Sequence, residues 1–101
     1  MTWGSYALEW YQRLITSPRP SGLSPTVLRI RGNRFYLFSR EEPRAHVHVQ
    51  YANGEAKLWL EPEVEFAQNH GLSVRRLATV VNLAREHRDE IQAAWRTRFG
   101  P

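Results

Sequence analysis

Apolar and polar residues alternate in two segments of the chain, and each segment has a turn signal at its centre. Residues 26–39 read TVLRIRGNRFYLFS around a Gly-Asn pair, and residues 46–60 read HVHVQYANGEAKLWL around an Asn-Gly pair. Alternation with a period of two is typical of a strand with one buried face, and such pairs favour two-residue turns. The pattern therefore predicts two β-hairpins.

Each predicted hairpin has one apolar and one polar face, because alternate residues of a strand point to opposite sides of a sheet. Placing the turns at the Gly-Asn and Asn-Gly pairs sets Ile30 opposite Phe35 and His48 opposite Trp59. The apolar face then holds Leu28, Ile30, Phe35, Leu37, Val47, Val49, Tyr51, Ala56, Leu58 and Leu60. The other face holds Arg29, Arg31, Arg34, Tyr36, His46, His48, Gln50, Lys57, Trp59 and Glu61. We expect this second face to be solvated.

Helical patterns follow the hairpins. Pro62 suits the first position of a helix and Gly71 suits a C-cap, so the segment between them is predicted to be helical. Ser73 suits the N-cap of a longer helix, whose apolar positions recur at intervals of three and four as far as Trp95. These helices can cover the apolar face of the sheet.

The first part of the chain differs from the rest. Aromatic residues recur at helical spacing in residues 1–17, and a Pro-rich stretch follows. We therefore predict an N-terminal helical extension and Pro-rich linker over residues 1–24, and a single α+β domain over residues 25–101. The predicted fold is two β-hairpins forming a four-stranded antiparallel sheet, packed on one face by C-terminal helices, with an extra N-terminal helix.

Composition narrows the classes of function. There is no cysteine, which excludes disulfides and thiol chemistry, and no apolar run approaches the length of a membrane span. We expect a cytoplasmic protein that does not contact a membrane. The net charge is +4, and residues 26–60 carry five arginines and Lys57 against three glutamates. Because the planar guanidinium group makes paired hydrogen bonds to phosphate, this excess favours a nucleic-acid ligand.

His46 and His48 are the candidate catalytic residues. Two residues apart on a strand, they would project from the same face about 7 Å apart. One imidazole could act as a base on a ribose 2′-hydroxyl and the other as an acid on the leaving oxygen, without metal or cofactor. Arg44 and Lys57 could bind the phosphate, and Trp59 or Tyr36 could stack on a base. The predicted nucleic-acid-binding set is Arg29, Arg31, Arg34, Tyr36, Arg44, Gln50, Lys57 and Trp59.

Other interpretations stay open at this point. A histidine on a strand is often only a structural polar residue. His46, His48 and Glu61 resemble a two-histidine, one-carboxylate metal site, although this pattern alone is weak. Ala67, Gly71 and Leu77 have helix–turn–helix spacing, in which Arg75 and Arg76 could reach a major groove.

From Pro25 onward the chain resembles the bacterial domain of unknown function 4160 family. The residues that carry the resemblance are PTVLRIRGNRFYLFSREEPRAHVHVQYANGEAKLWLEP, AQNHGLS and AWRTRFG, within residues 25–100. The resemblance implies a toxin-like half of a bacterial toxin–antitoxin pair, encoded beside a small partner. It brings no established reaction.

Two functional hypotheses follow. The leading one is a toxin-like component of a toxin–antitoxin module that acts on RNA, with metal-independent endoribonuclease as its specific form and a small antitoxin-like protein as its partner. The alternative is a non-enzymatic protein- or nucleic-acid-binding module that uses the same basic, histidine-bearing face. The sequence does not decide whether the protein is an enzyme.

Overall fold

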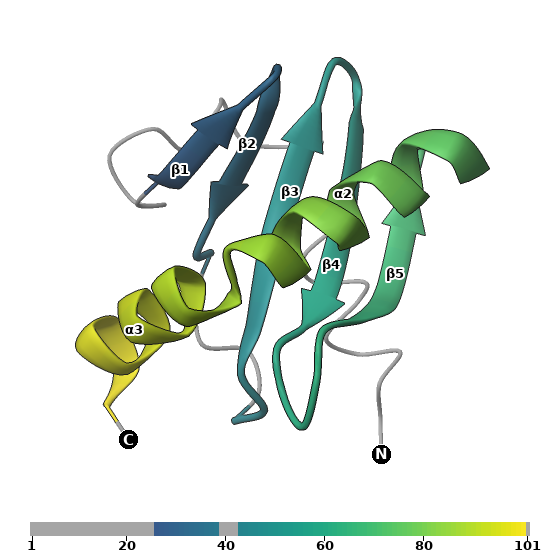
Figure 1. Cartoon of the computed structure of the whole chain (residues 1–101). Coiled ribbons are helices and arrows are strands. Elements are labelled where there is room, and N and C mark those ends of the chain that lie inside the picture. The colour runs from purple at the N-terminus through teal and green to yellow at the C-terminus, as the bar shows by residue number, and fades with distance from the viewer. Residues whose placement is uncertain (1–25, 39–42, 101) are drawn as a thin grey trace.

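The protein forms a five-stranded antiparallel sheet followed by two helices (Figure 1). The computed structural model describes residues 26–38 and 43–100. The predicted helix and linker within residues 1–24 lie outside the described residues. The strands follow one another in the order β1-β2-β3-β4-β5, so the predicted four-stranded sheet is wrong by one strand. The elements are β1 (Thr26–Ile30), β2 (Asn33–Tyr36), β3 (His46–Tyr51), β4 (Gly54–Trp59), β5 (Glu65–His70), α2 (Val74–Glu86) and α3 (Arg88–Phe99).

The additional strand, β5, occupies the segment for which the sequence predicts a helix. It pairs with β4, with Phe66 opposite Leu58. A short helix is marginal without tertiary packing, whereas this segment satisfies its backbone groups by pairing with the edge of β4. Strand pairing therefore outweighs the local pattern, and the predicted helix over residues 62–71 is wrong. The helix–turn–helix interpretation, which needs Ala67 on a helix, is wrong with it.

Both predicted hairpins form, but each turn lies one residue earlier than expected. The turn residues are Arg31 and Gly32 in the first hairpin and Ala52 and Asn53 in the second. Arg31 and Ala52 have φ angles of 51° and 52°, in the left-handed region that non-glycine residues visit rarely.

Packing explains the position of the second turn. A Cβ atom on Gly54 would lie 2.5 Å from Cδ2 of Leu72, so Gly54 is needed for close packing rather than within the turn. Because the turn lies one residue earlier, each residue of β3 pairs with a residue two positions earlier in β4 than predicted. His48, for example, pairs with Lys57 instead of Trp59. Because a strand has a period of two, the predicted division of side chains between the two faces is preserved.

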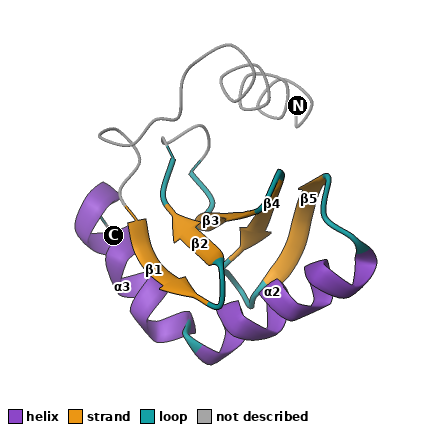
Figure 2. Cartoon of the chain, turned by 90° about the horizontal axis from the view of Figure 1, so that it is seen from above, coloured by secondary structure: helices purple, strands orange, loops and turns teal. Residues whose placement is uncertain are grey.

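The two helices lie on one face of the sheet, as expected (Figure 2). Ser73 is the N-cap of α2, as predicted, and its Oγ accepts a hydrogen bond from the Arg76 N–H at 3.0 Å. The single long helix expected as far as Trp95 is instead two helices, which meet at His87. The main core comprises Phe35, Leu37, Ala45, Val47, Val49, Ala56, Leu58, Leu60, Val64, Leu72, Val80, Leu83, Ala84, Ile91 and Trp95. No helix of the described residues is long and apolar enough to span a membrane.

Candidate functional site

The histidine-bearing face of the sheet is buried, contrary to the expectation of a solvated surface. The exposed fractions of His46 and His48 are 1% and 0%, and that of Lys57 is 2%. Tyr36 and Trp59, on the same face, are also buried. The candidate acid and base are therefore interior groups of this structure.

The two imidazoles belong to a continuous aromatic layer. The His48 ring stacks on Tyr36, with ring centroids 5.4 Å apart, and meets Phe38 edge-on at 5.5 Å. The His46 and His48 centroids are 5.4 Å apart, with the rings nearly perpendicular. His46 also lies 4.9 Å from the Trp95 ring of α3. This packing is typical of a structural core.

Hydrogen bonds and burial define the protonation of this layer. Nδ1 of His46 lies 2.7 Å from the Arg44 carbonyl oxygen, which can only accept, so Nδ1 carries the proton and donates it. Desolvation lowers the pKa of His48 well below its ordinary value of 6.5, and the neighbouring His46 and Lys57 lower it further. His48 is therefore neutral near pH 7. The Tyr36 hydroxyl donates to Oε1 of Glu55 at 2.5 Å.

Basic residues at the edge of this layer lie over its rings. The Arg44 guanidinium carbon is 4.2 Å from the centroid of the Trp59 ring, and that of Arg34 is 4.4 Å from the centroid of Tyr36. The Nε–H of Arg34 also donates to Oγ1 of Thr26 at 2.7 Å. These cations therefore make intramolecular contacts that stabilise the fold.

The structure divides the predicted nucleic-acid-binding residues into two groups. Those buried beside the histidines are Arg34, Tyr36, Lys57 and Trp59, whereas Arg29, Arg31 and Arg44 are exposed and Gln50 is half-buried. Glu61 is exposed in the segment that follows β4. Among the described residues, no group of three or more His, Cys, Asp or Glu side chains could hold a metal ion. His46, His48 and Glu61 are accordingly not assembled into a metal site.

A second cluster lies at the end of the sheet that carries both hairpin turns. The Arg76 guanidinium carbon is 3.8 Å from the centroid of the Tyr51 ring, and Nη2 of Arg76 donates to the Tyr51 hydroxyl at 3.1 Å. The Tyr51 ring also lies against Gly32, where an added Cβ would be 3.3 Å from it. The first turn, β3 and the start of α2 therefore meet here.

Four arginines belong to the elements at this end of the sheet: Arg29 lies near the end of β1, Arg31 in the first hairpin turn, and Arg75 and Arg76 in the first turn of α2. We call them the turn-end surface. The sequence pattern indicated Arg75 and Arg76 only as part of a helix–turn–helix. A signal was available: the first turn of α2 has no acidic residue, although acidic residues are favourable at that position.

Arginines at the opposite end of the sheet bind the protein's own backbone. Arg44 donates to the Glu61 carbonyl at 2.9 Å, and Arg88 donates to the Pro62 carbonyl at 3.0 Å. Arg85 donates to the Val64 carbonyl at 3.2 Å and 3.4 Å through Nη2 and Nε. We call these three the loop-end arginines, because they fix residues 60–64 between β4 and β5.

Comparison with known proteins identifies the family. Residues 32–96 match the family model described as Domain of unknown function (DUF4160). The chain belongs to this family. The match confirms the resemblance seen in the sequence, and the DUF4160 region extends from the first hairpin turn almost to the end of α3. Searches of curated proteins and of solved structures found no significant match.

Proposed function

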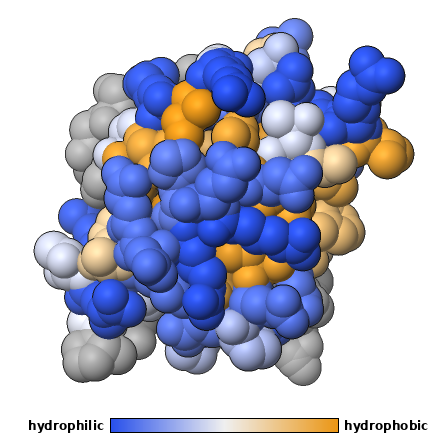
Figure 3. Space-filling model, viewed as in Figure 1, coloured by the Kyte–Doolittle hydropathy of each residue, from blue (hydrophilic) through white to orange (hydrophobic). Residues whose placement is uncertain are grey.

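We propose that this DUF4160 protein is a non-enzymatic RNA-binding module, and that its turn-end surface binds the phosphates. The observation that supports this proposal is that three of these arginines are exposed and do not bind other side chains or backbone groups of the described residues. Arg29, Arg31 and Arg75 are exposed, and none of them forms a side-chain hydrogen bond or ion pair within the described part of the chain. Figure 3 shows hydrophilic side chains at the upper edge of the molecule, where Figure 1 places the hairpin turns, as well as across the centre of this face.

Two features of this surface suit an anionic backbone. Arg76 is held flat against Tyr51 by stacking and by a hydrogen bond, so its orientation is fixed before a ligand arrives. The start of α2 adds the partial positive charge of a helix N-terminus to the charges of Arg75 and Arg76. Phosphate contacts of this kind give affinity that does not depend on sequence and that decreases steeply with salt.

Metal-independent endoribonuclease activity is the second candidate. The proximity of the His46 and His48 rings, together with Lys57, favours it. Burial of both imidazoles opposes it, because a general acid or base must come within hydrogen-bonding distance of the substrate. We therefore assign the histidines to the aromatic layer of the fold.

The proposal places the protein in a bacterial toxin–antitoxin pair, as the half that engages RNA. The support for this context is the resemblance of the sequence to toxin-like members of the family. A small antitoxin-like protein would then be the partner. Co-expression with the product of the neighbouring gene should restore growth if the DUF4160 protein alone inhibits it.

The proposed binding is tested by fluorescence anisotropy with a labelled single-stranded RNA between about 50 and 200 mM salt. Four phosphate contacts predict that log Kd rises with log salt concentration with a slope of about 3. A Kd that does not change with salt, or the absence of binding at low salt, would contradict the proposal.

Cleavage is tested on the same RNA in the presence of a chelator, with a His48→Gln variant as the comparison. We expect intact RNA after incubation with either protein. If the wild-type protein cleaves the RNA and His48→Gln does not, the non-enzymatic proposal is wrong and the protein is a ribonuclease.

A further inference from the structure

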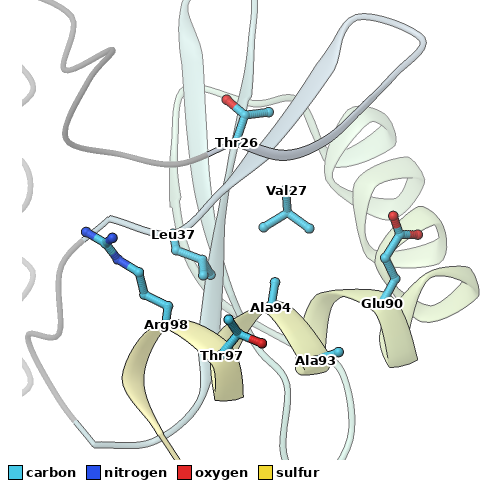
Figure 4. Close-up of a pocket in the computed structure, with 8 residues that line it drawn as sticks. All are labelled: Thr26, Val27, Leu37, Glu90, Ala93, Ala94, Thr97 and Arg98. Atoms are coloured by element: carbon cyan, nitrogen blue, oxygen red, sulfur yellow. The ribbon is translucent and has the colours of Figure 1, made fainter.

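A groove with a volume of about 620 Å³ lies between β1 and α3, on the helix-bearing side of the sheet (Figure 4). Val27 of β1 and Leu37, which follows β2, line one side, and Ala94 of α3 lines the other. Every residue that lines the groove belongs to the described part of the chain. None of them belongs to the turn-end surface.

Opposite charges mark the two ends of the groove. Figure 4 shows Glu90 and Arg98 of α3 at opposite ends of it. They are two helical turns apart, or about 12 Å along the helix axis. The groove-lining residues between them on α3 are Ala93, Ala94 and Thr97, whose small side chains leave space for a ligand. A ligand that carries both charges at this spacing would be complementary to the groove.

The adjoining strand has an open edge. β1 is the first strand of the sheet, and among the described residues no strand pairs with its outer side. Ile30 and Asn33 flank a two-residue turn and are a hydrogen-bonded pair of the antiparallel strands. Because hydrogen-bonded and non-hydrogen-bonded pairs alternate along such strands, the N–H and C=O of Arg29 point away from β2. The register also shifts between Thr26 and Leu28, which leaves Val27 outside the regular pairing and beside the groove. An added strand could therefore form hydrogen bonds with this edge.

We propose that the groove binds an extended segment of a partner protein, which adds to the edge of β1 and carries an acidic and a basic side chain four residues apart. Four residues of extended chain span about 13 Å, and residues i and i+4 point to the same side. The acidic side chain contacts Arg98, the basic side chain contacts Glu90, and a small apolar residue between them packs on Val27 and Ala94. This site does not depend on RNA binding.

The probe is a fluorescent synthetic peptide with the sequence Thr-Asp-Thr-Val-Thr-Lys-Thr, whose two charges are four residues apart. Its control moves the lysine one position earlier, which puts the two charges on opposite sides of an extended chain. The full-length protein should bind the first peptide several-fold more tightly than the control. Hydrogen exchange at the Arg29 amide should slow when the first peptide binds. Equal affinity for both peptides, or no slowing at Arg29, would overturn the proposal.

Matched variants test the charge assignment. Arg98→Glu should weaken binding of the first peptide about fivefold to tenfold, because an attraction becomes a repulsion. The same variant should bind a peptide with lysine at both charged positions more tightly than the wild-type protein does. Arg96→Glu makes the same charge change on an exposed position of α3 that does not line the groove, and it should have little effect.

Equal losses in Arg98→Glu and Arg96→Glu would overturn the proposal. Self-association is measured separately by sedimentation of the unliganded proteins. A wild-type dimer that Arg98→Glu dissociates would show that a second copy of the chain occupies the groove, and would also overturn it.

Discussion

Both ends of the sheet carry arginines, but the two groups differ in whether their side chains already hydrogen-bond to the protein's own backbone. At the loop end, Arg44, Arg85 and Arg88 donate hydrogen bonds to the backbone carbonyls of Glu61, Val64 and Pro62, respectively. At the turn end, Arg29, Arg31 and Arg75 are exposed and form no side-chain hydrogen bond within the described residues, whereas the half-buried Arg76 donates to the Tyr51 side chain. The count of arginines therefore overstates the positive charge that is available to a ligand. What matters is whether the fold already uses each guanidinium group.

The turn end depends on close backbone packing, and disrupting that packing should have the largest effect. A Cβ on Gly54 would lie 2.5 Å from Leu72 and 2.9 Å from the carbonyl carbon of Gly71, just before α2 begins. Gly54→Ala should lower the free energy of unfolding by about 3 kcal/mol, because overpacking against backbone cannot relax easily. Denaturant titration measures this loss.

Gly100→Ala is the matched control for that substitution. Gly100 has a positive φ of 86°, but an added Cβ meets nothing within 4 Å. Its cost should be limited to backbone strain of about 1 kcal/mol. If the two variants are equally stable, close packing at Gly54 is not what fixes the turn end.

The alternation of apolar and polar residues was sufficient to predict the two hairpins and the face of the sheet to which each of their residues belongs. The division of the hairpin residues between two faces was predictable because it survives a turn that slips by one residue. The turn positions were not predictable, because Gly54 is required by Leu72, which is distant in the sequence. The helical pattern before Gly71 concealed β5, whose formation depends on the free edge of β4.

The candidate site was less predictable than the fold. Polar residues such as His46 and Lys57 indicate a solvated face by pattern alone, yet both are buried. The sequence also gives no means of distinguishing Arg85, which donates to a distant carbonyl, from Arg75 on the same helix, which forms no side-chain hydrogen bond within the described residues. Both distinctions depend on tertiary contacts.

The aromatic layer that contains His48 should make the free energy of unfolding depend on pH. Because burial lowers the pKa of His48 in the folded state, the unfolded chain binds the proton more tightly. The contribution of His48 is therefore complete above about pH 6.5 and decreases as the pH falls from 6.5 towards the folded-state pKa.

In that interval the wild-type free energy of unfolding should fall by about 1.4 kcal/mol per pH unit relative to a His48→Phe variant, which cannot titrate. Denaturant titrations of both proteins at several pH values measure the difference. Parallel pH profiles for the two proteins would mean that His48 titrates alike in the folded and unfolded states.

Removing an arginine at the loop end should lower the free energy of unfolding more than removing one at the turn end. Arg85→Ala removes a charged donor from the Val64 carbonyl and should lower the free energy of unfolding by about 1 kcal/mol. Arg75→Ala, on the same helix, should change it by less than about 0.5 kcal/mol. Thermal or chemical denaturation compares the two variants, and equal losses would remove the distinction between the two ends.

The smallest effect should come from Tyr51→Phe. The variant keeps the ring beneath Arg76 but removes the hydroxyl that accepts from Nη2. Because Arg76 then loses part of its fixed orientation, the Kd for RNA should rise about twofold to threefold, with little change in stability. Anisotropy titration resolves this change, and an unaltered Kd would show that the hydroxyl has no part in orienting Arg76.

Two triple variants with the same loss of charge test the central claim most directly. One removes turn-end arginines (Arg29→Ala, Arg31→Ala and Arg75→Ala), and the other removes the loop-end arginines (Arg44→Ala, Arg85→Ala and Arg88→Ala). Both are titrated with the same single-stranded RNA, at one salt concentration and at a temperature where circular dichroism shows both to be folded. The first triple should weaken binding about tenfold or more, and the second by no more than about twofold. Equal weakening, or a greater loss in the loop-end triple, would contradict the claim.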